Sequence, residues 1–224
     1  MGKFRFVTDD TPPASLRKRV TLELATLVLL TPVFLYFAPR GMGLYSGVAL
    51  LFLAYVALTA KYTRDRIWGP PAAPRADRLR SSMLTLSALT IPAVAVFFAW
   101  GMWEGNQVAL GNLALAMGLY LPWALLQQTI FQFYFLGRLR VLLPLSPVVL
   151  AAVNGIAFGL VHLPYVPLML LAMVAGVFWS YSYLRDRVVL PIAISHALLG
   201  TTFYYAVVGR DLLGDWWAIM NAAV

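Results

Sequence analysis

The chain contains no cysteine and few charged residues. Of its 224 residues, 12% are charged and 61% are hydrophobic, whereas charged residues make up about 25% of an average soluble domain. So few charges cannot supply the polar surface of a soluble fold, which excludes an ordinary soluble domain and a disordered chain. The absence of cysteine excludes disulfides, thiolate nucleophiles and thiolate metal ligands. The composition therefore predicts a protein that crosses the membrane several times.

Long apolar runs predict an all-α fold, namely a polytopic bundle of about seven transmembrane helices. A spanning helix needs about 20 mostly apolar residues, because it must cross roughly 30 Å of hydrocarbon at 1.5 Å per residue. Spanning β-strands would be shorter and would alternate in hydropathy. The expected spans are residues 20–38, 43–60, 81–103, 107–136, 147–163, 165–184 and 188–208.

Basic residues predict how the spans are oriented, because cytoplasmic loops carry an excess of Lys and Arg. The segments that carry them are residues 1–19, 61–80, 137–140 and 185–187. Of the 17 basic residues, only Arg40 and Arg210 lie elsewhere. This distribution predicts an integral, multi-pass membrane protein with a cytoplasmic N-terminus. Topology then explains the net charge of +8, so we expect the lipid bilayer, and no nucleic acid, as a partner.

One proline-rich segment predicts a division of the chain. Gly-Pro-Pro-Ala-Ala-Pro at residues 69–74 is typical of a linker. The expected parts are a cytoplasmic tail at 1–19, a two-helix front at 20–60, a basic cytoplasmic linker at 61–80, a helical core at 81–210 and a tail at 211–224. We expect the last tail to lie at the membrane interface, because it carries Trp216 and Trp217.

Unusual polar side chains fall in three of the expected spans. Polar groups are costly in hydrocarbon and normally face the interior of a helix bundle. They are Gln127, Gln128 and Gln132 in the fourth span, Asn154 and His162 in the fifth, and His196 in the seventh. Any one of them alone is more often structural. Counted at 1.5 Å per residue, however, their depths agree within about 10 Å, so we expect one polar pocket inside the membrane.

These residues lie in three short motifs that occur in a fixed order. The motifs are Gln127-Gln128-Thr129-Ile130-Phe131-Gln132, Phe158-Gly159-Leu160-Val161-His162 and His196-Ala197-Leu198-Leu199-Gly200. They resemble the Glu-Glu-x-x-x-Arg, Phe-x-x-x-His and His-x-x-x-Asn motifs of the CAAX protease and bacteriocin-processing (CPBP) family of intramembrane endopeptidases. The resemblance covers roughly residues 120–205 and implies a CPBP-type helical core.

The resemblance also implies a mechanism, from which this sequence departs. In the family, a glutamate helped by the first histidine activates water, while the second histidine and the asparagine hold the oxyanion. Here both glutamates are glutamines, Gln132 replaces the arginine and Gly200 replaces the asparagine. A neutral amide cannot take a proton from water. Replacing the carboxylates and the arginine together nevertheless avoids a stranded buried charge.

Two functions are open at this point. In the first, the protein is an endopeptidase that cleaves near the terminus of a membrane-anchored peptide or protein. His162 is then the base, aligned by Gln127 and Gln128, and His196 donates to the oxyanion. The expected pocket residues are Gln132, Asn154, Phe158 and Gly200. In the second, the protein is a catalytically inactive relative that binds or chaperones a membrane-embedded or lipidated peptide.

Neither function requires a cofactor. A zinc site takes three or more protein ligands, and the chain has only two histidines. No carboxylate or thiolate lies near them in the sequence, so we expect no metal.

Overall fold

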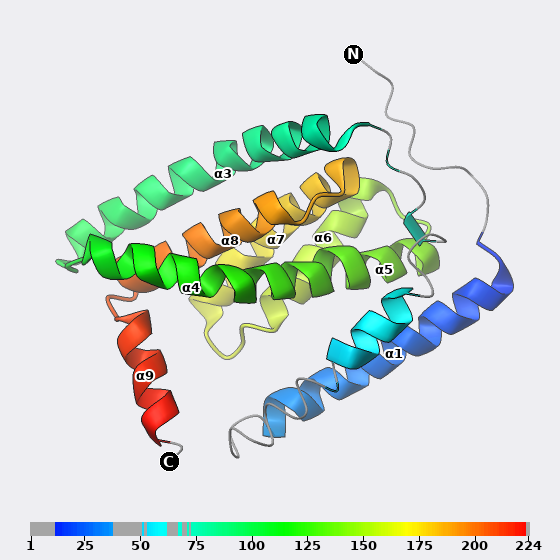
Figure 1. Cartoon of the computed structure of the whole chain (residues 1–224), viewed down its shortest axis with the longest axis horizontal. Coiled ribbons are helices and arrows are strands. Elements are labelled where there is room, and N and C mark those ends of the chain that lie inside the picture. Colours follow the sequence, from blue (N-terminus) through cyan, green and yellow to red (C-terminus); the bar gives the residue numbers. More distant parts are fainter. Residues whose placement is uncertain are drawn as a thin grey trace.

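The computed structural model describes residues 12–37, 51, 53–61, 67–68, 71 and 73–222. These residues form helices joined by short turns (Figure 1). The helices are α1 (Ala14–Phe37), α3 (Arg75–Trp103), α4 (Leu110–Gln128), α5 (Leu136–Leu142), α6 (Pro147–Leu160), α7 (Val166–Asp186), α8 (Leu190–Thr202) and α9 (Leu212–Ala222), with π-helical segments η2 (Thr129–Phe135) and η3 (Phe203–Val207). Residues 51, 53–61 and 67–68 are also helical.

The core is a bundle in which α8 packs against α3 and α4, and α6 packs against α7. Figure 1 shows α1 beside α5 at one edge of this bundle, and α9 extending away from it toward the C-terminus. Helix α4, the π-helical segment η2 and helix α5 follow one another without a break and form one continuous helical segment, Leu110–Leu142. This architecture confirms the predicted all-α helix bundle.

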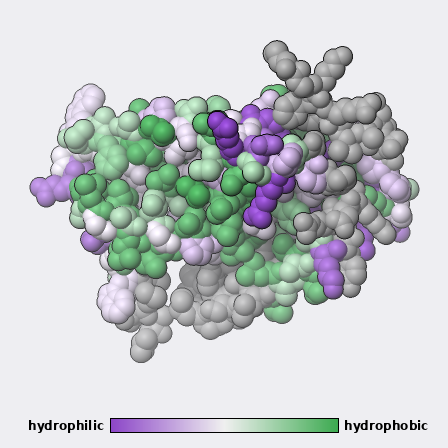
Figure 2. Space-filling model, turned by 45° about the horizontal axis from the view of Figure 1, so that its top comes forward, coloured by the Kyte–Doolittle hydropathy of each residue, from purple (hydrophilic) through white to green (hydrophobic). Residues whose placement is uncertain are grey.

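Four helical segments among the described residues are long and apolar enough to cross a membrane. They are Arg75–Trp103, Leu110–Leu142, Val166–Asp186 and Leu190–Val207. Large hydrophobic side chains are exposed along them, as at Leu84 and Ile91 of α3, and Figure 2 shows hydrophobic residues over much of the described surface. The protein is therefore an integral membrane protein. The predicted spans at 20–38 and 43–60 lie partly outside the described residues.

The predicted span at 147–163 is shorter than expected. Helix α6 has 14 residues and ends at Leu160, which gives about 21 Å at 1.5 Å per residue. Pro164 disfavours helical geometry at the residue before it, and residues 161–164 form a turn. His162 consequently lies in this turn and not inside the helix.

The predicted basic loop at 137–140 is wrong, because these residues belong to helix α5. Arg138 is 1% exposed, and its Nη2 lies 2.7 Å from Oε2 of Glu23 on α1. Its guanidinium also lies 3.2 Å from the centroid of the Tyr134 ring. On the other side, Arg19 Nε donates to Glu23 Oε1 at 3.0 Å. The buried ion pair between Arg138 and Glu23 therefore attaches α1 to the core.

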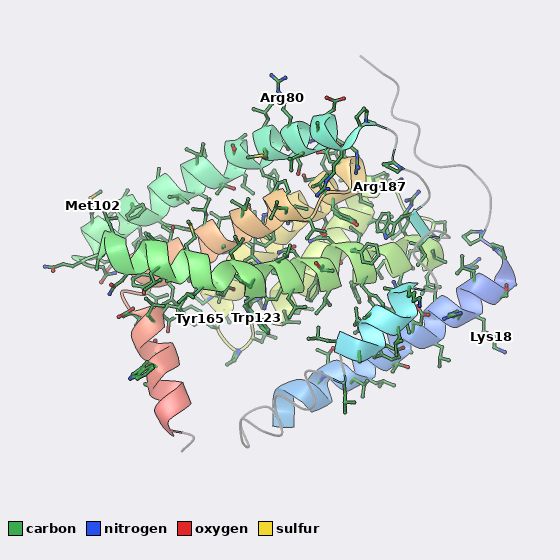
Figure 3. The ribbon with its side chains drawn as sticks, in the orientation of Figure 1. Lys18, Arg80, Met102, Trp123, Tyr165 and Arg187 are labelled. Carbon is green, nitrogen blue, oxygen red and sulfur yellow. The ribbon has the colours of Figure 1, made fainter. Side chains whose placement is uncertain are left out.

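Basic side chains still gather toward one end of the bundle. Figure 3 shows Lys18 and Arg187 toward the end where α1 and α8 begin, and Met102 toward the other end. Arg78, near the start of α3, donates to the carbonyl oxygens of Asp186 and Arg187. The orientation of this end toward the cytoplasm stays a prediction.

The π-helical segment η2 interrupts the regular α-helical hydrogen bonding of the backbone within the long segment Leu110–Leu142. Such segments leave carbonyl groups in need of other partners and are common at functional sites. Here the Trp68 indole donates to the carbonyl oxygen of Phe133 at 3.0 Å. A Cβ on Gly137 would lie 3.0 Å from the Trp68 ring, so glycine allows the indole to approach.

Glycines also bring α6 and α7 close together. A Cβ on Gly155 would lie 2.5 Å from the backbone nitrogen of Val177, and one on Gly176 would lie 2.9 Å from Cα of Gly155. The two backbones therefore touch at this level. As a result, Asn154 of α6 lies within hydrogen-bond distance of Ser180 on α7.

Candidate functional site

A chain of side-chain hydrogen bonds runs through the centre of the bundle. Gln128 at the end of α4 places Nε2 3.1 Å from Nδ1 of His196 on α8. One turn later, Gln132 of η2 donates from Nε2 to Gln128 Oε1 at 3.0 Å. Asn154 of α6 donates from Nδ2 to Gln132 Oε1 at 3.2 Å and to Ser180 Oγ of α7 at 2.7 Å. We call these five residues the amide ladder.

The amide ladder is shielded from its surroundings. Gln128, Gln132, Asn154 and Ser180 are 0% exposed, and His196 is 4% exposed. Burial of an amide without a partner costs about 1–3 kcal/mol, so these contacts explain how so many polar groups are tolerated. The buried contacts of Gln128, Gln132 and Asn154 are therefore made by neutral groups.

The donors of the ladder determine which nitrogen of His196 carries the proton. Because the Gln128 amide nitrogen donates to Nδ1, Nδ1 is the acceptor and the proton is on Nε2. This Nε2 lies 3.4 Å from the Tyr120 hydroxyl. The rings of Trp179 and Phe158 contact the imidazole at centroid distances of 4.9 and 5.4 Å.

His162 has the opposite tautomer to His196. Its Nδ1 lies 2.9 Å from the carbonyl oxygen of Phe158. A carbonyl only accepts, so Nδ1 carries the proton and Nε2 presents a lone pair. The Phe158 ring contacts both His162 and His196, at centroid distances of 5.1 and 5.4 Å. His162 lies outside the candidate spans, and burial lowers its pKa below the usual value, which keeps the imidazole neutral near pH 7.

The remaining predicted residues, apart from Asn154, are not members of the amide ladder. Gln127 has a buried Oε1 without a hydrogen-bond partner among the described residues, and Asn154 Oδ1 is in the same state. Gly200 faces Tyr120, because a Cβ there would lie 3.4 Å from Cε1 of that ring. In the described part of the chain, the hydrogen bonds of His162 do not reach the ladder.

Three residues that belong to the amide ladder or contact it were not expected from the sequence. Ser180 and Trp179 lie in an expected span without a motif, and serine and tryptophan are common in such helices. Tyr120 lies eight residues before Gln128, which places it on the same helical face two turns away. That spacing is the one signal that could have identified Tyr120.

Among the described residues, no group of three or more His, Cys, Asp or Glu side chains is arranged to hold a metal ion. The polar groups that the structure brings together around His196 are a phenol and several amides.

A comparison with protein families gave a match, which lies within the helical core. A family model described as Type II CAAX prenyl endopeptidase Rce1-like matches residues 109–202. The match includes α4 to α8 and all of the predicted site residues. This segment of the chain is therefore similar to type II CAAX prenyl endopeptidases, which agrees with the resemblance of its motifs to the CPBP family. Comparisons with curated proteins and with solved structures gave no match.

Proposed function

We propose that the protein is an intramembrane endopeptidase of the CAAX protease type. It hydrolyses a peptide bond near the terminus of a membrane-anchored substrate. The observation that supports this is the pair of opposite imidazole states, a lone pair on His162 Nε2 and an N–H on His196 Nε2. A hydrolase needs one group to take a proton and another to stabilise the oxyanion.

The two histidines divide the reaction between them. As water attacks the peptide carbonyl carbon, His162 Nε2 takes its proton. The oxyanion accepts a hydrogen bond from His196 Nε2. When the C–N bond breaks, His162 returns the proton to the leaving amine nitrogen. Gln127 orients the water through its Oε1, which has no partner among the described residues.

The other predicted residues act through position. Gln128 and Gln132 fix the His196 ring within the amide ladder, and Asn154 anchors the ladder in α6. Phe158 contacts both imidazoles and forms an apolar wall beside the reacting bond. Gly200 leaves room next to the Tyr120 ring for the substrate backbone.

One observation favours a second candidate function. The amides of Gln128 and Gln132 are hydrogen-bonded within the protein, at positions where the family has charged residues. On this hypothesis, the protein is a catalytically inactive relative that binds or chaperones a membrane-embedded or lipidated peptide.

A cleavage and binding assay distinguishes the two functions. The full chain in liposomes is mixed with a synthetic peptide that ends in a prenylated cysteine motif, and products are identified by mass. We expect cleavage by the wild type and by Tyr165→Phe, a control at the residue that follows this turn. His162→Ala should lose about 10²–10⁴-fold in rate, which is typical of removing a general base, while still binding the peptide. Binding without cleavage by the wild type would instead support the inactive relative.

A further inference from the structure

The far end of the amide ladder has a defined direction. Ser180 lies in α7, and its Oγ is 2.6 Å from the carbonyl oxygen of Gly176, one turn earlier. A hydroxyl has one proton, so a serine that donates to this carbonyl can only accept from its other neighbour. That neighbour is Asn154, which presents its Nδ2 at 2.7 Å. The serine therefore selects the amide orientation of Asn154.

The selected orientation passes along the ladder. Each amide accepts at its oxygen and donates at its nitrogen, so Asn154 Nδ2 meets Gln132 Oε1 and Gln132 Nε2 meets Gln128 Oε1. Reversal of a single amide would place two donors or two acceptors against each other. The ladder consequently reverses only as a unit, and its last member, Gln128 Nε2, meets His196 Nδ1.

We propose that Ser180 is a positioning residue that fixes, through the amide ladder, the tautomer of His196. In the reversed ladder, Gln128 would present its oxygen to His196, and Nδ1 would have to carry the proton. His196 Nε2 would then hold a lone pair and could not donate to an oxyanion. The inference rests on the proposed function for its role in catalysis, but the tautomer itself is defined without substrate.

The serine hydroxyl biases the ladder because reversal breaks its bond to Gly176. Loss of one hydrogen bond of ordinary net strength corresponds to roughly a fivefold change in the ratio of the two states. Ser180→Ala should therefore raise the population of the Nδ1–H tautomer of His196 by roughly fivefold relative to the wild type.

Nuclear magnetic resonance of the imidazole nitrogens measures this ratio. The chain has only two histidines, so the full protein labelled with ¹⁵N-histidine in nanodiscs gives two ring systems, assigned with His162→Gln. The spectra are taken at about pH 8, above the ordinary imidazole pKa of about 6.5. A protonated and an unprotonated ring nitrogen differ widely in shift, and mixing of tautomers brings the two shifts together.

The chain offers a matched control on the same helix. Ser182 is also 0% exposed, and its Oγ contacts Ser82 Oγ at 3.1 Å, outside the ladder. Ser182→Ala should leave the His196 shifts unchanged. Ser180→Thr retains the hydroxyl and should keep the wild-type tautomer.

The expected result is a wild-type His196 protonated on Nε2, with shifts that converge in Ser180→Ala but not in Ser182→Ala or Ser180→Thr. If that variant does not fold, Asn154→Leu, which disconnects the serine, should give the same convergence. A wild-type His196 protonated on Nδ1, or shifts that stay unchanged when the ladder is cut, would overturn the inference. Because this readout needs no substrate, absence of cleavage would contradict the proposed function alone.

Discussion

Removing one member of the buried Glu23–Arg138 ion pair should cause a large loss of stability. Both side chains are buried, at 4% and 1% exposure, and Glu23 Oε2 accepts from both Nε and Nη2 of Arg138, at 3.1 and 2.7 Å. Removing one member of a buried pair leaves the other charge uncompensated, which costs about 3–5 kcal/mol. We therefore expect Glu23→Gln to lower the free energy of unfolding by about this amount.

The control uses the other basic neighbour of Glu23. The Arg19 side chain is 43% exposed, and an exposed ion pair contributes about 0–1 kcal/mol. Arg19→Ala should thus be nearly neutral. The double variant Glu23→Leu with Arg138→Met removes both charges and should recover most of the loss, since an apolar replacement of a buried pair is often neutral.

Denaturant unfolding in detergent micelles, followed by tryptophan fluorescence, gives the required differences. If Glu23→Gln is no more harmful than Arg19→Ala, the pair does not attach α1 to the core. If the double variant is as unstable as Glu23→Gln, the loss does not come from a stranded charge.

Three further outcomes are expected. Cleavage should slow as the pH falls through the lowered pKa of His162, because protonation removes the lone pair; a midpoint above the ordinary value of about 6.5 would contradict this. Gln127→Glu should speed cleavage, since a carboxylate can take the proton that an amide cannot, and an unchanged rate measured by mass would count against a water at this position. Single cysteines at the exposed Ala73 and Glu104 should react with an impermeant maleimide from opposite sides, with Ala73 cytoplasmic; labelling from one side would refute the topology.

Much of the amide ladder could be predicted from the sequence. Gln128, Gln132, Asn154 and His196 stand out because polar side chains inside apolar runs must face the bundle interior. Their spacing gives the shared helical face within each span. The order of the motifs then indicates which spans meet, since the family resemblance supplies the arrangement of the helices.

The contacts of the ladder with α7 could not be predicted in the same way. Ser180 meets Asn154 because Gly155 and Gly176 allow two backbones to touch, and a single sequence does not show which helix faces pack together. Serine is also small enough to be placed anywhere in an apolar helix. Its role depends on the rotation of α7, which only the structure provides.

The assignment of residues 137–140 to a loop was wrong, because these residues belong to helix α5. Arg138 fits the pattern of a cytoplasmic loop, but its partner Glu23 lies 115 residues away in the chain. His162 was expected inside a span because residues 147–163 are apolar. The turn before Pro164 ends the helix earlier and leaves the imidazole partly accessible.

Chemical rescue of His162→Ala tests the histidine-centred site most directly. The rate of product formation from a membrane-anchored peptide is measured for the wild type and for the variant, with and without added imidazole. The proposed role as general base predicts a loss of about 10²–10⁴-fold in the variant and partial recovery with imidazole, which replaces the missing base in the accessible turn. Cleavage by His162→Ala at the wild-type rate, without imidazole, would contradict it.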